Sequence, residues 1–202
     1  MSSLAPRHRE TSATALTLAL DCSTPFLAIA VVDDSGRVLA RFGEDVGRGH
    51  AARAVNELAA LVGTLPDGRE RVRRVVAGTG PGSYTGVRVA LATSAGLARA
   101  LGAELTGASS FVALAAGLLA AGEEAVVTLD ARRGNVYAAR CLREAGEEDV
   151  AAVVRVTAGP VKVAAAAASE LGHGLPVIEA GRPDAAALAM SPQTGPAVAV
   201  YL

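Results

Sequence analysis

The sequence has few of the residue types on which metal sites, nucleophilic catalysis and base stacking depend. Among its 202 residues, aromatic side chains make up 3%, Trp is absent, and there are only three His and two Cys. No two of the His and Cys residues stand at the spacing of zinc ligands, so we expect no metal site. Two distant cysteines without a disulfide framework indicate a reducing compartment, and we expect a cytoplasmic protein.

Neither sign of charge is in excess. The chain carries 19 Lys and Arg against 20 Asp and Glu, which gives a formal net charge of −1. A protein that binds nucleic acid by itself usually has a basic surplus and often stacking aromatics. We therefore expect tRNA or DNA not to be held by this chain alone. No run approaches the roughly 20 apolar residues of a membrane-spanning helix, so no membrane association is expected.

Aliphatic residues, in contrast, are abundant. Hydrophobic residues make up 51% of the chain, an ordinary composition for one large folded domain or two small ones. Two arginines precede the apolar stretch Ala13–Leu20 and imitate a signal peptide. Asp21 stands where a small residue should precede the cleavage point. We interpret the stretch as a strand and residues 1–14 as a disordered extension.

The first half of the chain alternates between strand and helix patterns. Three apolar runs joined by tight connections predict an antiparallel meander over Thr17–Asp21, Phe26–Asp33 and Arg37–Phe42. An amphipathic helix is predicted over His50–Leu65. Its buried stripe is expected to comprise Ala51, Val55, Leu58, Val62 and Leu65.

A basic run, a strand and a second helix follow. We interpret Arg69–Arg74 as a solvated lead-in to a buried strand over Arg74–Gly78, because Glu70 interrupts the basic run. The helix predicted over Val87–Leu101 is apolar nearly all round, which requires cover on more than one side.

The pattern then begins again. The apolar run Ala125–Asp130 resembles the run that ends at Asp21, and each is followed by a short polar loop and a second apolar run. A third strand is predicted over Val150–Val156, before a helix-prone alanine run. These features favour two diverged copies of one unit, with coincidence as the alternative.

Two strand ends carry polar groups that suit phosphate or magnesium chemistry. Asp21, Ser23 and Thr24 follow the first strand, and Asp130 ends its counterpart. Such a loop presents hydroxyl groups and backbone N–H groups to an anion, with the carboxylate near a metal. The alternative is a turn in which Asp21 and Ser23 bond to nearby backbone. Arg132 and Arg133 could hold a phosphate, although arginines on a hairpin are more often solvated.

A glycine-rich loop lies between the fourth predicted strand and the second helix. It comprises Gly80, Pro81, Gly82, Ser83, Tyr84, Thr85 and Gly86, with Arg88 just beyond it. Glycine allows positive φ and close backbone approach, and the helix N-terminus offers N–H groups to an anion. The loop lacks the Lys of a Walker motif and the glycine spacing of a dinucleotide fold. The alternative is a connection that lets a helix pack closely on its sheet.

The remaining reactive side chains have ordinary structural explanations. His50 opens a helix, where a capping or surface role is more common than metal ligation. Cys22 has no basic partner nearby in sequence, and Cys141 stands in an apolar strand, so both thiols are expected to be inert.

Three stretches together resemble the TsaB family, also called YeaZ. They are Leu18–Thr24, Gly78–Arg88 and Asp130–Tyr137, of which the stretch through the glycine-rich loop is the most specific. The resemblance spans residues 16 to 140. The region after Ala145 is shorter than in many members of the family, and the chain ends at Leu202, where the family often continues through an Arg.

This resemblance implies the actin-like, sugar-kinase and Hsp70-like fold: two similar α/β domains, each with a mixed sheet flanked by helices. We expect the domains over residues 15–108 and 109–202, the second one shortened. TsaB-like proteins pair with TsaD, a homologous subunit that holds metal and transfers the threonylcarbamoyl group to tRNA. TsaE, an ATPase, joins the pair, and TsaC supplies threonylcarbamoyl-adenylate. The His-x-x-x-His pair of TsaD is absent, since Ala54 follows His50 at the fourth position.

We therefore expect a non-catalytic scaffold that activates a TsaD-like catalyst and forms a homodimer when alone. Its partner surface is expected to use both helices, through Ala54, Leu61, Val89, Ala92, Ala95, Gly96 and Arg99. ATP or ADP with magnesium could bind at a site shared with partner subunits. The alternatives are an independent ATPase or phosphotransferase of the same fold, and a Rossmann-type oxidoreductase, which the opening meander disfavours.

Overall fold

The computed structural model describes residues 14–146 and 150–202, so the extension expected at residues 1–14 lies almost entirely outside the described residues. Thr14 is already attached to the fold, because its carbonyl oxygen accepts a hydrogen bond from Nε of Arg71 at 2.9 Å.

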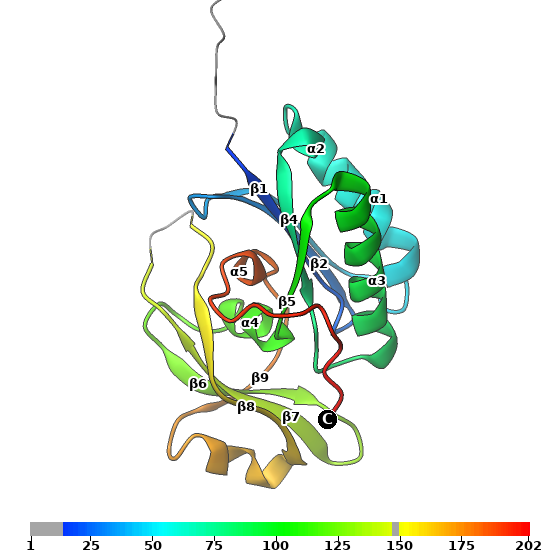
Figure 1. Cartoon of the computed structure of the whole chain (residues 1–202). Helices are drawn as coiled ribbons and strands as arrows, with labels where there is room; N and C mark the ends of the chain where they lie inside the picture. The colour runs from blue at the N-terminus through cyan, green and yellow to red at the C-terminus, as the bar shows by residue number, and fades with distance from the viewer. Residues whose placement is uncertain (1–13, 147–149) are drawn as a thin grey trace, which may run out of the picture.

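Figure 1 shows the arrangement of the helices and strands. In chain order they are β1 Leu16–Asp21, β2 Phe26–Asp33, β3 Val38–Asp45, α1 His50–Gly63, α2 Gly68–Arg71, β4 Val72–Gly78, α3 Tyr84–Leu101, β5 Glu104–Ala108, α4 Ser110–Ala116, β6 Glu124–Asp130, β7 Asn135–Arg143, β8 Val154–Ala164, the 3-10 helix η1 Ala165–Leu171, β9 Val177–Glu179 and α5 Ala186–Ala189.

Two mixed sheets share one topology. The first has the order β3-β2-β1-β4-β5, with β1, β2 and β3 antiparallel and β4 parallel to β1. The second has the order β8-β7-β6-β9, again with an antiparallel meander and a parallel fourth strand. The predicted repetition is therefore confirmed, and the predicted actin-like fold with it. An opening meander is also incompatible with a Rossmann fold, which begins with a βαβ unit.

Helices cover both faces of the first sheet. In Figure 1, α1 and α3 lie on one face, and α4 and α5 lie on the other, between the two sheets. Strands enclosed in this way are expected to be continuously apolar rather than alternating. Residues Leu27–Val32 of β2 are indeed all buried. Every residue of α4 is buried as well, and Phe111 has no exposed surface. One core cluster joins both sheets through these two short helices.

The buried stripe of α1 has a different phase from the predicted one. His50, Ala54, Leu58 and Val62 are buried, whereas Ala51 and Val55 are exposed. His50, expected to be a cap or a surface residue, is 5% exposed, and its Nε2 lies 3.2 Å from the Phe26 carbonyl oxygen. That contact turns the His50 side of the helix toward the sheet. Alanines on several sides of the helix hide this phase in the sequence.

Helix α3 begins three residues before the predicted start. Ser83 is its N-cap, with its hydroxyl accepting a hydrogen bond from the Gly86 amide at 3.2 Å. Such a cap satisfies one of the four free amides of the first turn. The expected cover on more than one side is present in part: α3 packs on the first sheet and also against α1, where Val89 and Leu97 join a core cluster that includes Leu58, and one face of the helix is left exposed in the described chain. Val87, Ala90, Ser94 and Ala98 face the sheet, while Ala92, Ala95, Gly96 and Ala100 are exposed.

Three further predictions need correction. The third strand of the second sheet runs over Val154–Ala164, further along the chain than expected. The alanine run that follows forms the end of this strand and a 3-10 helix. The basic run contains the one-turn helix α2, and Arg74 is not simply solvated, because its Nη2 donates to the carbonyl oxygen of Ala189 at 2.6 Å. None of the helices in the described part of the chain is long and apolar enough to cross a membrane.

Candidate functional site

The carboxylate of Asp21 is engaged inside the protein. Its Oδ1 accepts hydrogen bonds from the amide and the hydroxyl of Ser23, at 2.8 and 2.6 Å, and its Oδ2 accepts one from Oγ of Ser110 at 2.5 Å. Asp21 has no exposed surface. Burial raises its pKa above the ordinary value, against the opposing effect of these hydrogen bonds. The aspartate therefore fixes the end of β1 and has no surface to offer a ligand directly.

The glycine-rich loop is packed against the same strand end. The Ser83 amide donates to the Ser23 carbonyl oxygen at 2.7 Å. A Cβ atom on Gly86 would overlap the carbonyl oxygen of Cys22, and one on Gly82 would overlap that of Ser23. These two glycines thus allow the start of α3 to lie directly on the connection between β1 and β2.

A large cavity of about 980 Å³ lies beside the loop. It brings together Ser23 and Thr24 from the first half of the chain with Asp130 and Arg132 from the second. Arg48, Tyr84 and Tyr137 also line it, which adds one cationic and two aromatic groups. The predicted residues Ser23, Thr24 and Asp130 therefore meet at one cavity, whereas Asp21 is buried and does not line it.

The polar groups in this cavity are bonded to their own neighbours. Oγ1 of Thr24 accepts a hydrogen bond from the Phe26 amide at 3.2 Å. Oδ1 of Asp130 accepts one from the Arg132 amide at 2.8 Å, and its Oδ2 lies 3.5 Å from Nη1 of Arg132. Among the described residues, no three Asp, Glu, His or Cys side chains converge as metal ligands would. The two aspartates do not fit a magnesium site built from side chains.

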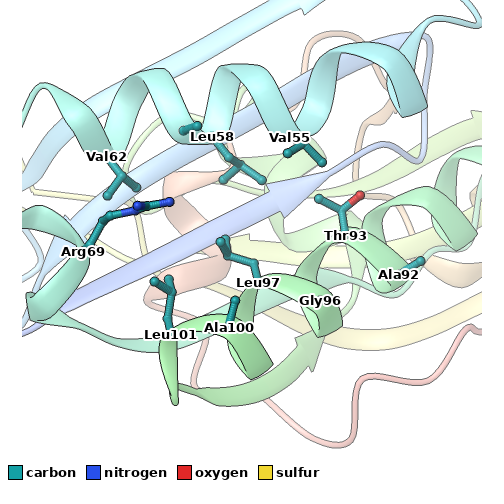
Figure 2. A pocket seen from close by; sticks show the side chains of 11 residues that line it. Val55, Leu58, Val62, Arg69, Ala92, Thr93, Gly96, Leu97, Ala100 and Leu101 are labelled. Atoms are coloured by element: carbon teal, nitrogen blue, oxygen red, sulfur yellow. The ribbon is translucent and has the colours of Figure 1, made fainter.

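A second candidate surface lies between α1 and α3. An open groove of about 360 Å³ lies between these helices, and Figure 2 shows the side chains that line it. Its lining residues are Val55, Leu58, Ala59, Val62, Arg69, Ala92, Thr93, Gly96, Leu97, Ala100 and Leu101. Val55 is 60% exposed, and nothing lies within 4 Å of a Cβ atom built on Gly96. Close approach by another backbone is therefore sterically open at Gly96.

The residues predicted for a partner surface differ in how exposed they are to solvent. Ala92 and Gly96 line the groove, and Ala95 and Arg99 are exposed on the same helix. Val89 and Leu61 are half-buried. Ala54 has no exposed surface and packs in the core between α1 and the first sheet, so it is left out of the partner surface. Val55 was missed, because its apolar character in a helical pattern predicted burial.

An aromatic cluster extends the exposed side of α3 toward its N-terminus. The ring centroids of Tyr84 and Tyr201 lie 5.2 Å apart, and the guanidinium carbon of Arg88 lies 4.9 Å from the centre of the Tyr84 ring. The Val200 amide holds the C-terminal segment in place by donating to the Thr79 carbonyl oxygen at 2.8 Å. Sequence patterns gave no sign of this contact, because it joins residues far apart in the chain.

Comparisons with known proteins agree with this architecture. A family model described as "TsaD: tRNA N6-adenosine threonylcarbamoyltransferase" matches residues 41–200. YeaZ from Pseudomonas aeruginosa has a similar structure, with a TM-score of 0.70 and 23% identity, covering 93% of this chain and 100% of that chain. At this identity, the structural match shows the fold alone.

Relatives are also found by sequence. An uncharacterised protein of Mycobacterium tuberculosis is 36% identical over 200 residues, covering 92% of this chain and 90% of that protein. The tRNA threonylcarbamoyladenosine biosynthesis protein TsaB of Escherichia coli is 34% identical over 131 residues, covering 63% of this chain and 55% of that protein. TsaB of Bacillus subtilis is 32% identical over 126 residues, covering 59% of this chain and 52% of that protein. The matches with TsaB thus span about half of those proteins. Fold, motifs and relatives together show that the chain belongs to the TsaB (YeaZ) family.

Proposed function

We propose that this chain is a non-catalytic subunit in the biosynthesis of threonylcarbamoyladenosine on tRNA, acting in the cytoplasm by binding and stabilising a TsaD-like catalytic subunit. The observation that carries this proposal is the open apolar face of α1 and α3. Small exposed residues on α3 and the exposed Val55 on α1 border a groove that no element of the described chain covers. Small residues allow two helices to approach closely, and apolar surface is removed from water when they do.

The names of the relatives supply the pathway for the proposal. TsaB of two bacteria carries the name of a threonylcarbamoyladenosine biosynthesis protein, and the model that matches this chain describes the transferase. In this proposal, a TsaE-like ATPase joins the pair and tRNA is contacted indirectly. The chain would self-associate through the same face when the catalytic subunit is absent.

The test is reconstitution of tRNA modification from TsaC-, TsaD- and TsaE-like proteins with and without this chain. Modification is expected to depend on the chain, and equal product in its absence would overturn the proposal. Ala95→Arg places a long cation on the exposed face of α3 and is expected to abolish both complex formation and modification. Ala166→Arg on η1 is the matched control, since Ala166 is also exposed but lies far from α3 in the chain and on the other sheet.

A second proposal is that the cavity beside the glycine-rich loop binds ATP or ADP, at a surface completed by partner subunits. It is supported by the convergence of Ser23, Thr24 and Asp130 on one cavity. Titration of the isolated chain and of the complex with ATP and magnesium tests it. Binding by the complex that is weakened in Asp130→Ala is expected. Binding to neither would overturn it, and ATP hydrolysis by the isolated chain would favour an independent ATPase.

A further inference from the structure

The groove between α1 and α3 contains a single charged side chain. Arg69 of α2 stands at one end of it, and the other lining residues are apolar or, at Thr93, neutral. In Figure 2, the Arg69 side chain lies beside Val62 and extends between the two helices. A partner that fills this groove would therefore cover apolar surface and a guanidinium group together.

The guanidinium of Arg69 differs from those of its neighbours. Arg71 donates to the carbonyl oxygens of Thr14 and Pro66, and Arg73 to those of Glu70 and Val72. Arg53 on α1 pairs with two carboxylates. Among the residues that the structure describes, Arg69 has neither a hydrogen bond nor an ion pair, and it is exposed. An arginine covered by a partner without a carboxylate or equivalent acceptor would lose hydration without compensation.

A second copy of this chain does not supply that acceptor from the same groove. No Asp or Glu lines it. A twofold dimer places the same patch of both copies face to face, so each groove would bring an arginine and no acid. Self-association through this face is therefore electrostatically less favourable than binding to an acidic partner surface.

We propose that the surface of the TsaD-like subunit that enters this groove carries a carboxylate that pairs with Arg69, and that this pair favours the mixed complex over self-association. The inference rests on the proposed function, and it adds the chemistry that the partner must present. Guanidinium and carboxylate groups form two parallel hydrogen bonds, which fix orientation as well as adding affinity. The apolar walls of the groove would strengthen the pair by excluding water.

The composition of the chain allows a direct test. Lys162 is its single lysine. In a Lys162→Arg background, Arg69→Lys therefore introduces one new side-chain amine at the end of the groove. A carbodiimide joins amines to carboxylates that are in contact, and peptide mass spectrometry identifies both ends of the link. Arg133→Lys in the same background is the control, because Arg133 is exposed on the turn between β6 and β7.

A link from residue 69 to an Asp or Glu of the TsaD-like subunit is expected, with no such link from residue 133. Arg69→Glu is expected to weaken the mixed complex by about tenfold or more, and added salt to weaken the wild-type complex more than the variant. A complex that forms normally but gives no link and is unaffected by Arg69→Glu would overturn this inference and leave the docking proposal intact. Absence of any complex with the unaltered chain would overturn the docking proposal itself.

Discussion

Oγ of Ser110 donates a hydrogen bond of 2.5 Å to Oδ2 of Asp21, which joins the start of α4 to the end of β1. The same hydroxyl accepts a hydrogen bond from the Gly80 amide at 3.0 Å. One buried group thus connects the first strand, the glycine-rich loop and the helix that leads toward the second sheet. The position of Asp21 at a strand end suggested that it binds a ligand. In the structure, its carboxylate instead stabilises the junction of these three segments.

Asp21→Ala is expected to destabilise the chain by about 2–4 kcal/mol, because it leaves buried donors of Ser23 and Ser110 without an acceptor. Asp33 is a matched control. Its Oδ1 accepts hydrogen bonds from the amide and the hydroxyl of Ser35 and from the amide of Arg37, but in an exposed turn. Asp33→Ala is expected to cost about 1 kcal/mol or less, since water replaces the lost acceptor. Urea unfolding measures the free energy of unfolding of both variants. Equal losses of stability would contradict the expectation that burial makes the Asp21 hydrogen bonds more important.

The stability contribution of Asp21 is expected to depend on pH. Burial raises its pKa above 3.8 in the folded state, so folding favours the protonated form. The contribution of Asp21 to stability is therefore greatest below pH 3.8, and it is lost as the pH rises through the raised pKa of the folded state. The free energy of unfolding of the wild type, relative to Asp21→Asn, should therefore fall as the pH rises above the ordinary pKa of an aspartate.

Asp33 should show the opposite trend. Although desolvation opposes it, hydrogen bonds from Ser35 and Arg37 hold the pKa of Asp33 below 3.8 in the folded state. Relative to Asp33→Asn, the wild type should therefore lose stability as the pH falls below the ordinary range of an aspartate. Parallel trends for the two aspartates would show that the Asp21 profile has another origin.

Two neighbouring positions on α1 are expected to separate stability from partner binding. Leu58 is 3% exposed, and Leu58→Ala should cost about 2–5 kcal/mol by leaving a cavity. Val55 is 60% exposed, so Val55→Ser should change stability by about 0.5 kcal/mol or less. The same Val55→Ser change should weaken binding to a TsaD-like subunit, measured by calorimetry. Unchanged binding would remove Val55 from the proposed surface.

Two glycines of α3 should respond oppositely to alanine. At Gly86 a Cβ atom would overlap the Cys22 carbonyl oxygen, so Gly86→Ala is expected to destabilise the chain by about 1–3 kcal/mol. At Gly96 the space is open, so Gly96→Ala should stabilise the isolated chain by about 1 kcal/mol through helix propensity. Thermal unfolding measures both, at a dilution where size-exclusion chromatography shows the isolated chain to be monomeric, so that self-association does not cover Gly96. Destabilisation by Gly96→Ala would mean that this face is already covered.

Both cysteines are expected to be unreactive in the folded chain. Burial raises the pKa of Cys141 to about 12 and raises that of Cys22 as well. Because the thiolate is the reactive form and neither side chain is exposed, alkylation should occur only after unfolding. Mass spectrometry after iodoacetamide treatment, with and without denaturant, tests this. Rapid modification of Cys22 in the native chain would show that the β1–β2 connection opens.

Much of the fold was predictable because it depends on local patterns. Runs of aliphatic residues fixed β1, β2 and β4, and the paired strand ends at Asp21 and Asp130 indicated the repeated topology. The prediction of which face of α1 is buried was wrong. Alanines on several sides of the helix obscure the apolar stripe, and the contact between His50 and Phe26 joins residues far apart in the sequence. The site residues Ser23, Thr24 and Asp130 were named from their strand ends, but their shared cavity depends on how the two sheets are placed.

The sequence by itself determined the family, through motifs whose residue types and spacing are specific, and it determined the order of most strands and helices through hydrophobic periodicity. Only the tertiary structure decided which polar groups are buried and which apolar groups are exposed. Asp21 is a buried hydrogen-bond acceptor because the chain folds so that Ser110, distant in sequence, donates a hydrogen bond to it. Val55 and Arg69 line the same open groove because α1, α2 and α3 pack on one sheet face. Burial and exposure depend on contacts between distant segments, which no local pattern encodes.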